Sequence, residues 1–260
     1  MENAVTIEKS CRSGFINSFT LHIIAMALML LDHLQATVLS DYAVLTRLGR
    51  LAFPIFAFMI AEGFYHTKNV KKYLLRMLFF ALISEIPFNL MVGSSVFYYA
   101  HQNVMWTFLL AILSLLIFEK LKEKHIIMQI IFIPSTVLIF YLIGMFTLVD
   151  YHGEGILMVM LFYFTRAKKD TPLRQRLVLM LVQVLGMYYI NCEMLKGLVI
   201  PVELFGHTFE IVQQGLALLA LPIIWCYSTK QGPYNKAIKY FYYLFYPAHL
   251  LVLGLIVYFG

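Results

Sequence analysis

Two ionisable residues, Asp32 and His33, lie side by side in an otherwise apolar segment, residues 21–39. A charged side chain at the centre of a membrane helix costs about 2.5–3.5 kcal/mol on insertion scales, and such residues usually serve transport, proton transfer or catalysis. Imidazole has the ordinary pKa nearest neutrality, so a histidine oriented by a carboxylate can act as a general base. We expect this role for His33, with Asp32 as its partner; the alternative is that the pair only joins two helices.

Two further histidines occur in apolar segments. His22 lies eleven residues before His33, close to three helical turns, so both side chains share one helix face. His249 follows Pro247 in the last apolar segment, and we expect it to face the protein interior. Either His33 or His249 could be the base, and the adjacent carboxylate favours His33.

Charged residues also occur in the second apolar segment. Arg50 lies near one end and Glu62 near the other. An interfacial arginine often extends harmlessly toward water, whereas an acid as deep as Glu62 needs a cationic partner. We expect that partner to be Lys72 or Arg76 on the next segment.

The composition indicates an integral membrane protein. Hydrophobic residues make up 61% of the 260-residue chain and charged residues only 13%, whereas soluble domains carry about 25% charged residues. Because no polar block is long enough for a soluble domain, we expect one membrane domain, 1–260, with a polar cytoplasmic N-terminal segment, 1–17.

The apolar segments predict an all-α integral membrane fold with about nine transmembrane helices. They cover residues 18–39, 48–66, 73–92, 103–119, 126–149, 154–166, 176–192, 208–228 and 238–259. The loop between the seventh and eighth segments, residues 191–207, is the longest outside connection. Val199–Pro201 within it could dip into the membrane.

The positive-inside rule supports this count. With the N-terminus in the cytoplasm and the C-terminus outside, all but three of the 20 lysines and arginines fall on the cytoplasmic side; the exceptions are Arg47, Arg50 and Lys196. The net charge of +6 therefore reflects topology, and we expect no nucleic-acid partner.

Several enzyme classes lack their motifs. The chain contains no GxSxG, HExxH, P-loop or dinucleotide-binding pattern. The histidines are scattered without the spacing of metal ligands, so we expect no metal.

The residues themselves resemble the bacterial TraX family. The motifs that carry the resemblance are Asp32-His33, LGRLAFPIFAFMIAEG at 48–63, ISEIPFN at 83–89, NVM at 103–105 and FYPAH at 245–249. The family is named for a conjugation protein that N-acetylates pilin, and it is grouped with multi-span acyltransferases. The resemblance implies a multi-pass protein of the bacterial inner membrane that transfers an acetyl group from cytoplasmic acetyl-CoA to an amine or hydroxyl.

Combined with the polar residues, this resemblance assigns candidate roles. The catalytic set is His33, Asp32, His249 and Arg50, with Arg50 or Asn103 stabilising the oxyanion. The set near the acetyl-CoA phosphates is Glu62, His66, Lys68, Lys72 and Arg76, although these lysines could equally serve only topology. The acceptor, which could be a small molecule, glycan or peptide, would meet Glu85, Asn89, His101 and Asn103. We expect membrane lipid around the chain. The sequence leaves open whether the protein forms a homo-oligomer.

Two other function classes fit the same residues. A proton-coupled transporter or flippase could use Asp32, Glu62, Glu85 and the histidines as a proton relay. A structural subunit of a larger membrane assembly would need these residues only for folding or assembly.

Overall fold

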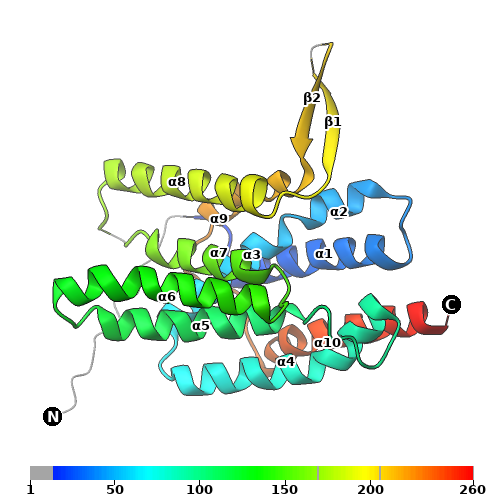
Figure 1. The fold of residues 1–260 in the computed structure, drawn as a ribbon, viewed down its shortest axis with the longest axis horizontal. Coiled ribbons are helices and arrows are strands. Elements are labelled where there is room, and N and C mark those ends of the chain that lie inside the picture. Colours follow the sequence, from blue (N-terminus) through cyan, green and yellow to red (C-terminus); the bar gives the residue numbers. More distant parts are fainter. Residues whose placement is uncertain (1–13, 169, 205, 260) are drawn as a thin grey trace.

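The structure, a computed structural model, describes residues 14–168, 170–204 and 206–259. Lys9, Cys11, Arg12 and most of the expected polar segment 1–17 lie outside the described residues. The elements form a helical bundle with a β-hairpin projecting from its side (Figure 1). In chain order they are α1 (Ser18–Thr37), α2 (Ala43–Gly49), α3 (Ala52–His66), α4 (Val70–Gly93), α5 (Val104–Leu121), α6 (Ile126–Phe146), α7 (His152–Phe164), α8 (Leu173–Tyr188), the π-helix η1 (Tyr189–Met194), β1 (Val199–Leu204), β2 (His207–Val212), the 3-10 helix η2 (Gln213–Leu219), α9 (Ala220–Trp225) and α10 (Lys236–Phe259).

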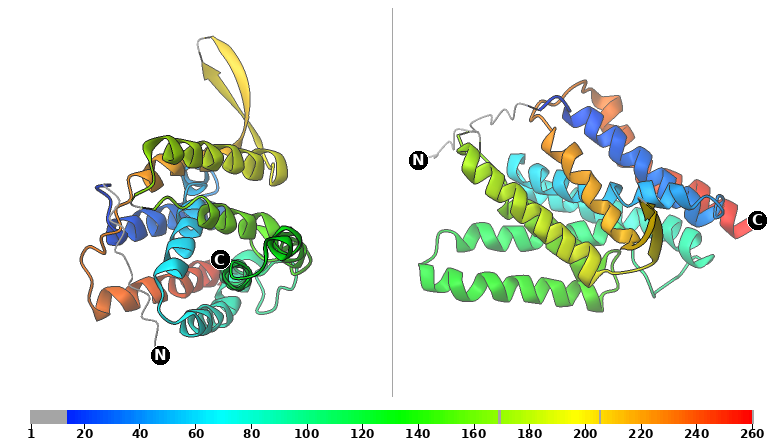
Figure 2. Two further views of the ribbon diagram at one scale, coloured as in Figure 1. Left: turned by 90° about the vertical axis from the view of Figure 1, so that its left-hand side faces the viewer. Right: turned by 90° about the horizontal axis from the view of Figure 1, so that it is seen from above.

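Helix α3 forms the centre of the bundle. Its sequence combines large aromatic residues with small alanines, and Phe53, Ala57, Phe58 and Ala61 are all buried. Helices α1, α5, α7 and α9 pack around it, and Figure 2 shows α3 enclosed by its neighbours. A helix that is apolar on every side belongs in such an interior position.

Asparagine side chains define where three helices begin. Asn17, Asn69 and Asn103 precede α1, α4 and α5, and each accepts a hydrogen bond from a backbone N–H of the first turn. These N-caps satisfy donors that a helix cannot pair internally.

Seven helices among the described residues are long and apolar enough to cross a membrane, which confirms a mainly helical membrane protein. They are α1, α2 with α3, α4, α5, α6, α8 with η1, and α10. The expected sixth and eighth spans correspond to shorter apolar helices, His152–Phe164 and Gln213–Trp225. A helix of 13 residues reaches about 20 Å, against about 30 Å of hydrocarbon. The described residues therefore support seven spanning helices and not the expected nine.

Helix α6 shows which surface faces lipid. It is the most apolar of the seven helices, yet only Thr136, Phe140 and Gly144 are buried. Exposed apolar surface on this scale marks contact with a membrane or a partner rather than with water.

The hairpin departs from the all-α expectation. Strands β1 and β2 pair antiparallel with Val199 opposite Val212, and Gly206 has the positive φ that a tight turn favours. The expected eighth span is wrong at its beginning, because residues 208–212 belong to β2. The stretch Val199–Pro201, which we expected to enter the membrane, instead forms the first strand, in keeping with its β-branched residues.

The loops gather at two ends of the bundle. Those that follow α3, α5 and α7 lie at the left in Figure 1, and those that follow α4 and α6 lie at the right. The loops after α3, α5 and α7, whose basic residues we expected on one side of the membrane, therefore lie at the same end of the bundle. Helices α1 and α10 run side by side in the same direction, since His22 stacks on Tyr242 and His33 contacts His249.

A buried ion pair ties α3 to the loop after α7. Arg166 Nε donates to Glu62 Oε1 over 2.7 Å, and both side chains are less than a tenth exposed. His66 Nε2 lies 3.3 Å from the other carboxylate oxygen. The expectation that Lys72 or Arg76 pairs with Glu62 is wrong. The partner of Glu62 is Arg166, which lies 104 residues later in the sequence.

This ion pair predicts a large stability effect. Arg166→Leu should lower the free energy of unfolding by about 3–5 kcal/mol, because the Glu62 carboxylate stays buried without its arginine. Unfolding of the purified protein in mixed micelles, followed by circular dichroism, measures the change. Lys72→Gln is the control, since exposed Lys72 should change stability by about 0.5 kcal/mol or less. Equal effects of the two substitutions would contradict the prediction.

Candidate functional site

A cavity of about 560 Å³ lies between α1, α3, α10 and the residues that precede α5 and α7. It extends from His22 and Tyr242, near the beginnings of α1 and α10, to His101, Asp150 and His152 at the opposite end. Four methionines and five phenylalanines contribute to an otherwise mixed wall. A mainly apolar cavity with a few convergent polar groups is typical of a ligand site.

His33 and His249 form a hydrogen-bonded pair at this cavity. His33 Nδ1 lies 2.8 Å from His249 Nε2, and His249 Nδ1 lies 2.7 Å from the carbonyl oxygen of Phe245. A carbonyl only accepts, so His249 Nδ1 carries a proton and the neutral ring offers a lone pair at Nε2. His33 must then donate from Nδ1, which leaves its own Nε2 unprotonated. The expectation that His249 faces the interior is confirmed.

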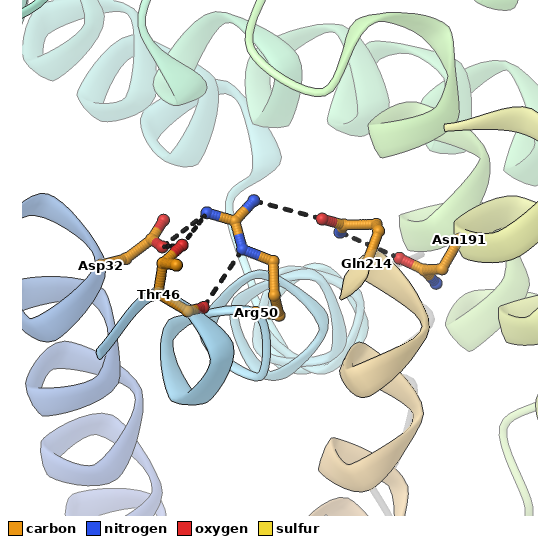
Figure 3. A network of polar contacts seen from close by, with 5 residues as sticks. All are labelled: Asp32, Thr46, Arg50, Asn191 and Gln214. Carbon is orange, nitrogen blue, oxygen red and sulfur yellow. Dashed lines mark hydrogen bonds and ion pairs between the residues drawn. The ribbon is translucent and has the colours of Figure 1, made fainter. Parts of the chain in front are cut away.

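Arg50 is the centre of a second polar network (Figure 3). Its Nη2 donates to Asp32 Oδ1 over 2.5 Å and to Thr46 Oγ1 over 2.9 Å, and its Nη1 donates to Gln214 Oε1 over 3.2 Å. Gln214 Nε2 in turn donates to Asn191 Oδ1 over 3.2 Å. The network therefore joins α1, the α2–α3 junction, η2 and η1.

The Asp32 carboxylate does not orient His33 as expected. Its Oδ1 accepts from Arg50 and Thr46, and the His33 ring is held by His249 instead. Neighbours in a helix point about 100° apart, so Asp32 faces α2 while His33 faces α10. Asp32 still lies at the cavity wall, where its charge acts on the site.

Gly49 lets α2 approach this network closely. A Cβ atom at position 49 would lie 2.4 Å from Cβ of Asp32. A larger residue would displace the carboxylate from Arg50, so the glycine found here fits a steric requirement.

A third polar group stands at the far end of the cavity. His101 Nε2 lies 3.2 Å from Asp150 Oδ1, and the His101 and His152 rings are stacked with centroids 6.3 Å apart. The hydrogen bond to Asp150 raises the pKa of His101 above its ordinary value, against the opposing effect of burial. This carboxylate and imidazole have the relationship that we expected for Asp32 and His33.

Three residues assigned to the acceptor brace the helices instead of lining this cavity. Glu85 Oε2 accepts from Asn103 Nδ2 over 2.5 Å and from Trp106 Nε1 over 2.9 Å, which ties α4 to α5. Asn89 donates to the carbonyl oxygen of Val96. His101 is the member of that expected set that lines the cavity.

The residues assigned to acetyl-CoA lie elsewhere. Glu62 and His66 belong to the ion pair with Arg166. Lys68 and Lys72 are exposed beyond the end of α3, and the Arg76 guanidinium lies 6.0 Å from the ring centroid of Tyr243. Their role in binding a donor stays a prediction. Within the described residues, no three His, Cys, Asp or Glu side chains are grouped so that they could hold a metal ion.

The sequence of the whole bundle matches one family. The family model described as TraX protein matches residues 18–257. The chain belongs to the TraX family. A relative of this TraX-family protein from Dichelobacter nodosus is described as "Probable fimbrial assembly protein FimC, serogroup H1"; the two are 27% identical over 249 residues, which cover 91% of this chain and 94% of the relative. No solved structure matches this chain significantly.

Sequence reasoning missed part of the site of this TraX-family protein. Thr46, Asn191 and Gln214 complete the Arg50 network, but none was among the candidates. A signal existed for two of them, because Asn191 and Gln214 are polar residues inside expected apolar spans. The same criterion identified Glu85.

The Arg50 network predicts measurable coupling in this TraX-family protein. A double-mutant cycle of Asp32→Asn and Arg50→Gln should give a coupling free energy of about 1–3 kcal/mol. Each single substitution leaves the remaining charged side chain without its oppositely charged partner. Unfolding in mixed micelles measures the four variants. The matched cycle of Asp41→Asn and Arg47→Gln, two exposed residues of the same region, should give a value near zero. No coupling between Asp32 and Arg50 would contradict the network.

Proposed function

We propose that this TraX-family protein is a membrane-embedded acyltransferase that moves an acetyl group from cytoplasmic acetyl-CoA to an amine, or a hydroxyl, at or across the bacterial inner membrane. The His33–His249 pair supports this most strongly. Its hydrogen bonds leave His33 Nε2 unprotonated on a ring that lines a cavity within apolar helices. A positioned imidazole of this kind is the usual general base for acyl transfer.

In the proposed step, His33 Nε2 takes a proton from the acceptor nitrogen as that nitrogen attacks the thioester carbonyl. The C–N bond forms, and negative charge develops on the carbonyl oxygen. The C–S bond then breaks, and the departing thiolate takes the proton back from His33. His249 keeps accepting from His33 Nδ1 throughout, which holds the ring in one orientation.

The developing oxyanion requires a donor near the cavity. Arg50 fits this role better than Asn103, because Arg50 lines the cavity while Asn103 is committed to Glu85 and the carbonyl oxygen of Ala81. A fixed guanidinium near developing negative charge stabilises the transition state without reorganising. Asp32 holds that guanidinium in place.

We infer that the chain crosses the membrane nine times, with the N-terminus in the cytoplasm and the C-terminus outside. The common end of the loops that follow α3, α5 and α7 supports this topology, because those loops and the helix ends beside them carry 12 of the 20 basic residues. Helix α7 and residues 213–225 would complete the sixth and eighth crossings together with the extended residues beside them.

A second pocket offers a place for the donor. It has a volume of about 190 Å³, is lined by Ser18, Tyr234 and Lys239, and shares His22 and Tyr242 with the main cavity. In the proposed topology it lies at the cytoplasmic end. Lys239 would meet a phosphate of acetyl-CoA, and the thioester arm would reach His33 past the stacked rings. Lys68, Lys72 and Arg76 line neither pocket and form the competing proposal.

Two observations suggest an acceptor: the acidic residues on the proposed outer side and the description of the Dichelobacter nodosus relative. The π-helix η1 and the hairpin, on the proposed outer side, carry Glu193, Glu203 and Glu210, which attract a cationic amine. Because the relative is described as a fimbrial assembly protein, we propose the amino group of a pilin-like polypeptide as the first acceptor to test, beside small amines and amino sugars.

Turnover by the purified protein in nanodiscs tests the proposed reaction. The wild type should release free CoA from acetyl-CoA when an acceptor is present. His33→Ala should lower kcat by about 10²–10⁴-fold, because the general base is lost. His249→Gln should lose less activity than His249→Ala, since an amide oxygen can still accept from His33. His125→Gln, at the exposed beginning of α6, is the control.

Full activity in a folded His33→Ala variant would contradict the proposed base. If no acceptor yields CoA, the acyltransferase proposal fails. Acceptor-dependent proton flux into liposomes under those conditions would then support the transporter instead.

Donor binding distinguishes the two basic sites. Lys239→Gln should raise KM for acetyl-CoA about tenfold, because a charge-assisted hydrogen bond is lost. The same variant should leave KM unchanged for S-acetyl-N-acetylcysteamine, a thioester without phosphates. Lys72→Gln is the matched comparison. A KM increase in Lys72→Gln alone would instead favour the beginning of α4 as the site of the phosphates.

A further inference from the structure

The pair of His101 and Asp150 at the far end of the cavity has no part in the step described above. Its position is fixed by the backbone: Gln102 N donates to Leu148 O, and Asp150 N donates to Gln102 O, each over 2.9 Å. The Asp150 carbonyl also accepts from the Thr107 hydroxyl. The loop before α5 and the loop before α7 therefore hold the carboxylate and the imidazole together.

The backbone around Asp150 is held in an unfavourable conformation. Leu148, Tyr151 and His152 have φ angles of 53°, 59° and 44°, in the left-handed region that residues with a side chain rarely adopt. Such conformations persist where the surrounding structure enforces them, and they concentrate at functional sites. Tyr151 is fixed further by stacking on Phe53 with ring centroids 3.7 Å apart.

An unpartnered polar atom lies beside this pair. His152 Nδ1 is buried without a hydrogen-bond partner, and His152, His101 and Asp150 all line the same cavity. A buried ring nitrogen without a partner is destabilising unless a ligand or water satisfies it. The end of the cavity thus contains a carboxylate, an imidazole paired to it and a second imidazole with unused hydrogen-bonding capacity.

We propose that His101, held by Asp150, takes the first proton from a protonated amine acceptor, so that a neutral amine reaches His33. This inference rests on the proposed function. The amine arrives as R–NH3⁺; one N–H bond breaks, the proton binds His101 Nδ1, and R–NH2 remains. His101 donates to Asp150 from Nε2 and later releases its new proton to the outer solution. His33 then takes the second proton during attack on the thioester.

The surroundings of His101 suit a cationic ligand. The hydrogen bond to Asp150 raises its pKa, which makes the ring a stronger proton acceptor. Glu85 on α4 adds negative potential in the same direction. The other titratable or charged groups that line the cavity are Asp32, Arg50, Lys196, three histidines (His22, His33 and His152) and three tyrosines (Tyr151, Tyr242 and Tyr246).

The test compares acceptors of different basicity in nanodiscs with acetyl-CoA. For an aliphatic primary amine at pH 7, His101→Gln should lower kcat/KM for the acceptor about a hundredfold. The deficit should shrink as the pH rises toward the pKa of the amine, because solvent then removes the first proton. For an aromatic amine, which is already neutral at pH 7, the variant should stay within about twofold of the wild type. His207→Gln, an exposed histidine of the hairpin, should change neither rate.

Asp150→Asn provides a second variant, expected to show the same dependence on acceptor basicity with a smaller deficit. An equal loss for both amines at every pH would overturn the proposal, as a merely structural role predicts that result. No loss with either amine would overturn it as well. The wild-type protein tests the acyltransferase reaction itself. If that reaction does not occur, the wild type transfers acetyl to neither amine.

Discussion

Polar side chains inside the bundle meet no hydrogen-bonding groups in lipid, so they are stable only when paired within the protein or with a ligand or water. The structure meets this constraint by joining residues that lie far apart in the sequence: His33 with His249, Asp32 with Arg50, and Glu62 with Arg166. These contacts tie α1 to α10 and to the α2–α3 junction, and α3 to the loop after α7. The cavity takes its polar wall from the same contacts, so the groups that hold the helices in register also define the site.

Two groups of polar residues lie at different ends of one cavity. His22 and Tyr242 stand at one end, beside the smaller pocket, and His101 and Asp150 stand at the other. On α1, His33 lies eleven residues beyond His22, toward the second end, and Arg50 lines the same cavity. For a transfer reaction across a membrane this order is useful, because a donor and an acceptor that approach from opposite sides meet at the residues in the middle. In the proposed transfer, the apolar part of the wall would limit competition between bulk water and the acceptor.

Composition and motif were enough to predict a helical TraX-family membrane protein, because hydropathy fixes the class of element at each segment. Polar residues in apolar segments marked His33, Arg50 and His249 as side chains that need partners inside the bundle, since burying such groups is costly wherever it occurs, and all three have such partners. The partners could not be predicted. Arg166 pairs with Glu62, and His249 with His33, because of how helices pack, which sequence spacing does not encode. The hairpin was missed because its apolar strand residues resemble the beginning of a membrane span.

The central histidine pair joins positions 216 residues apart, one on the first helix and one on the last. A ribosome makes α10 after every other helix described above, so a nascent chain without α10 lacks the second ring. Contacts of such long sequence separation form late and slowly compared with local ones. A chain that stops before α10 therefore lacks the His33–His249 pair, and any chemistry that depends on this pair begins only after α10 has packed against α1.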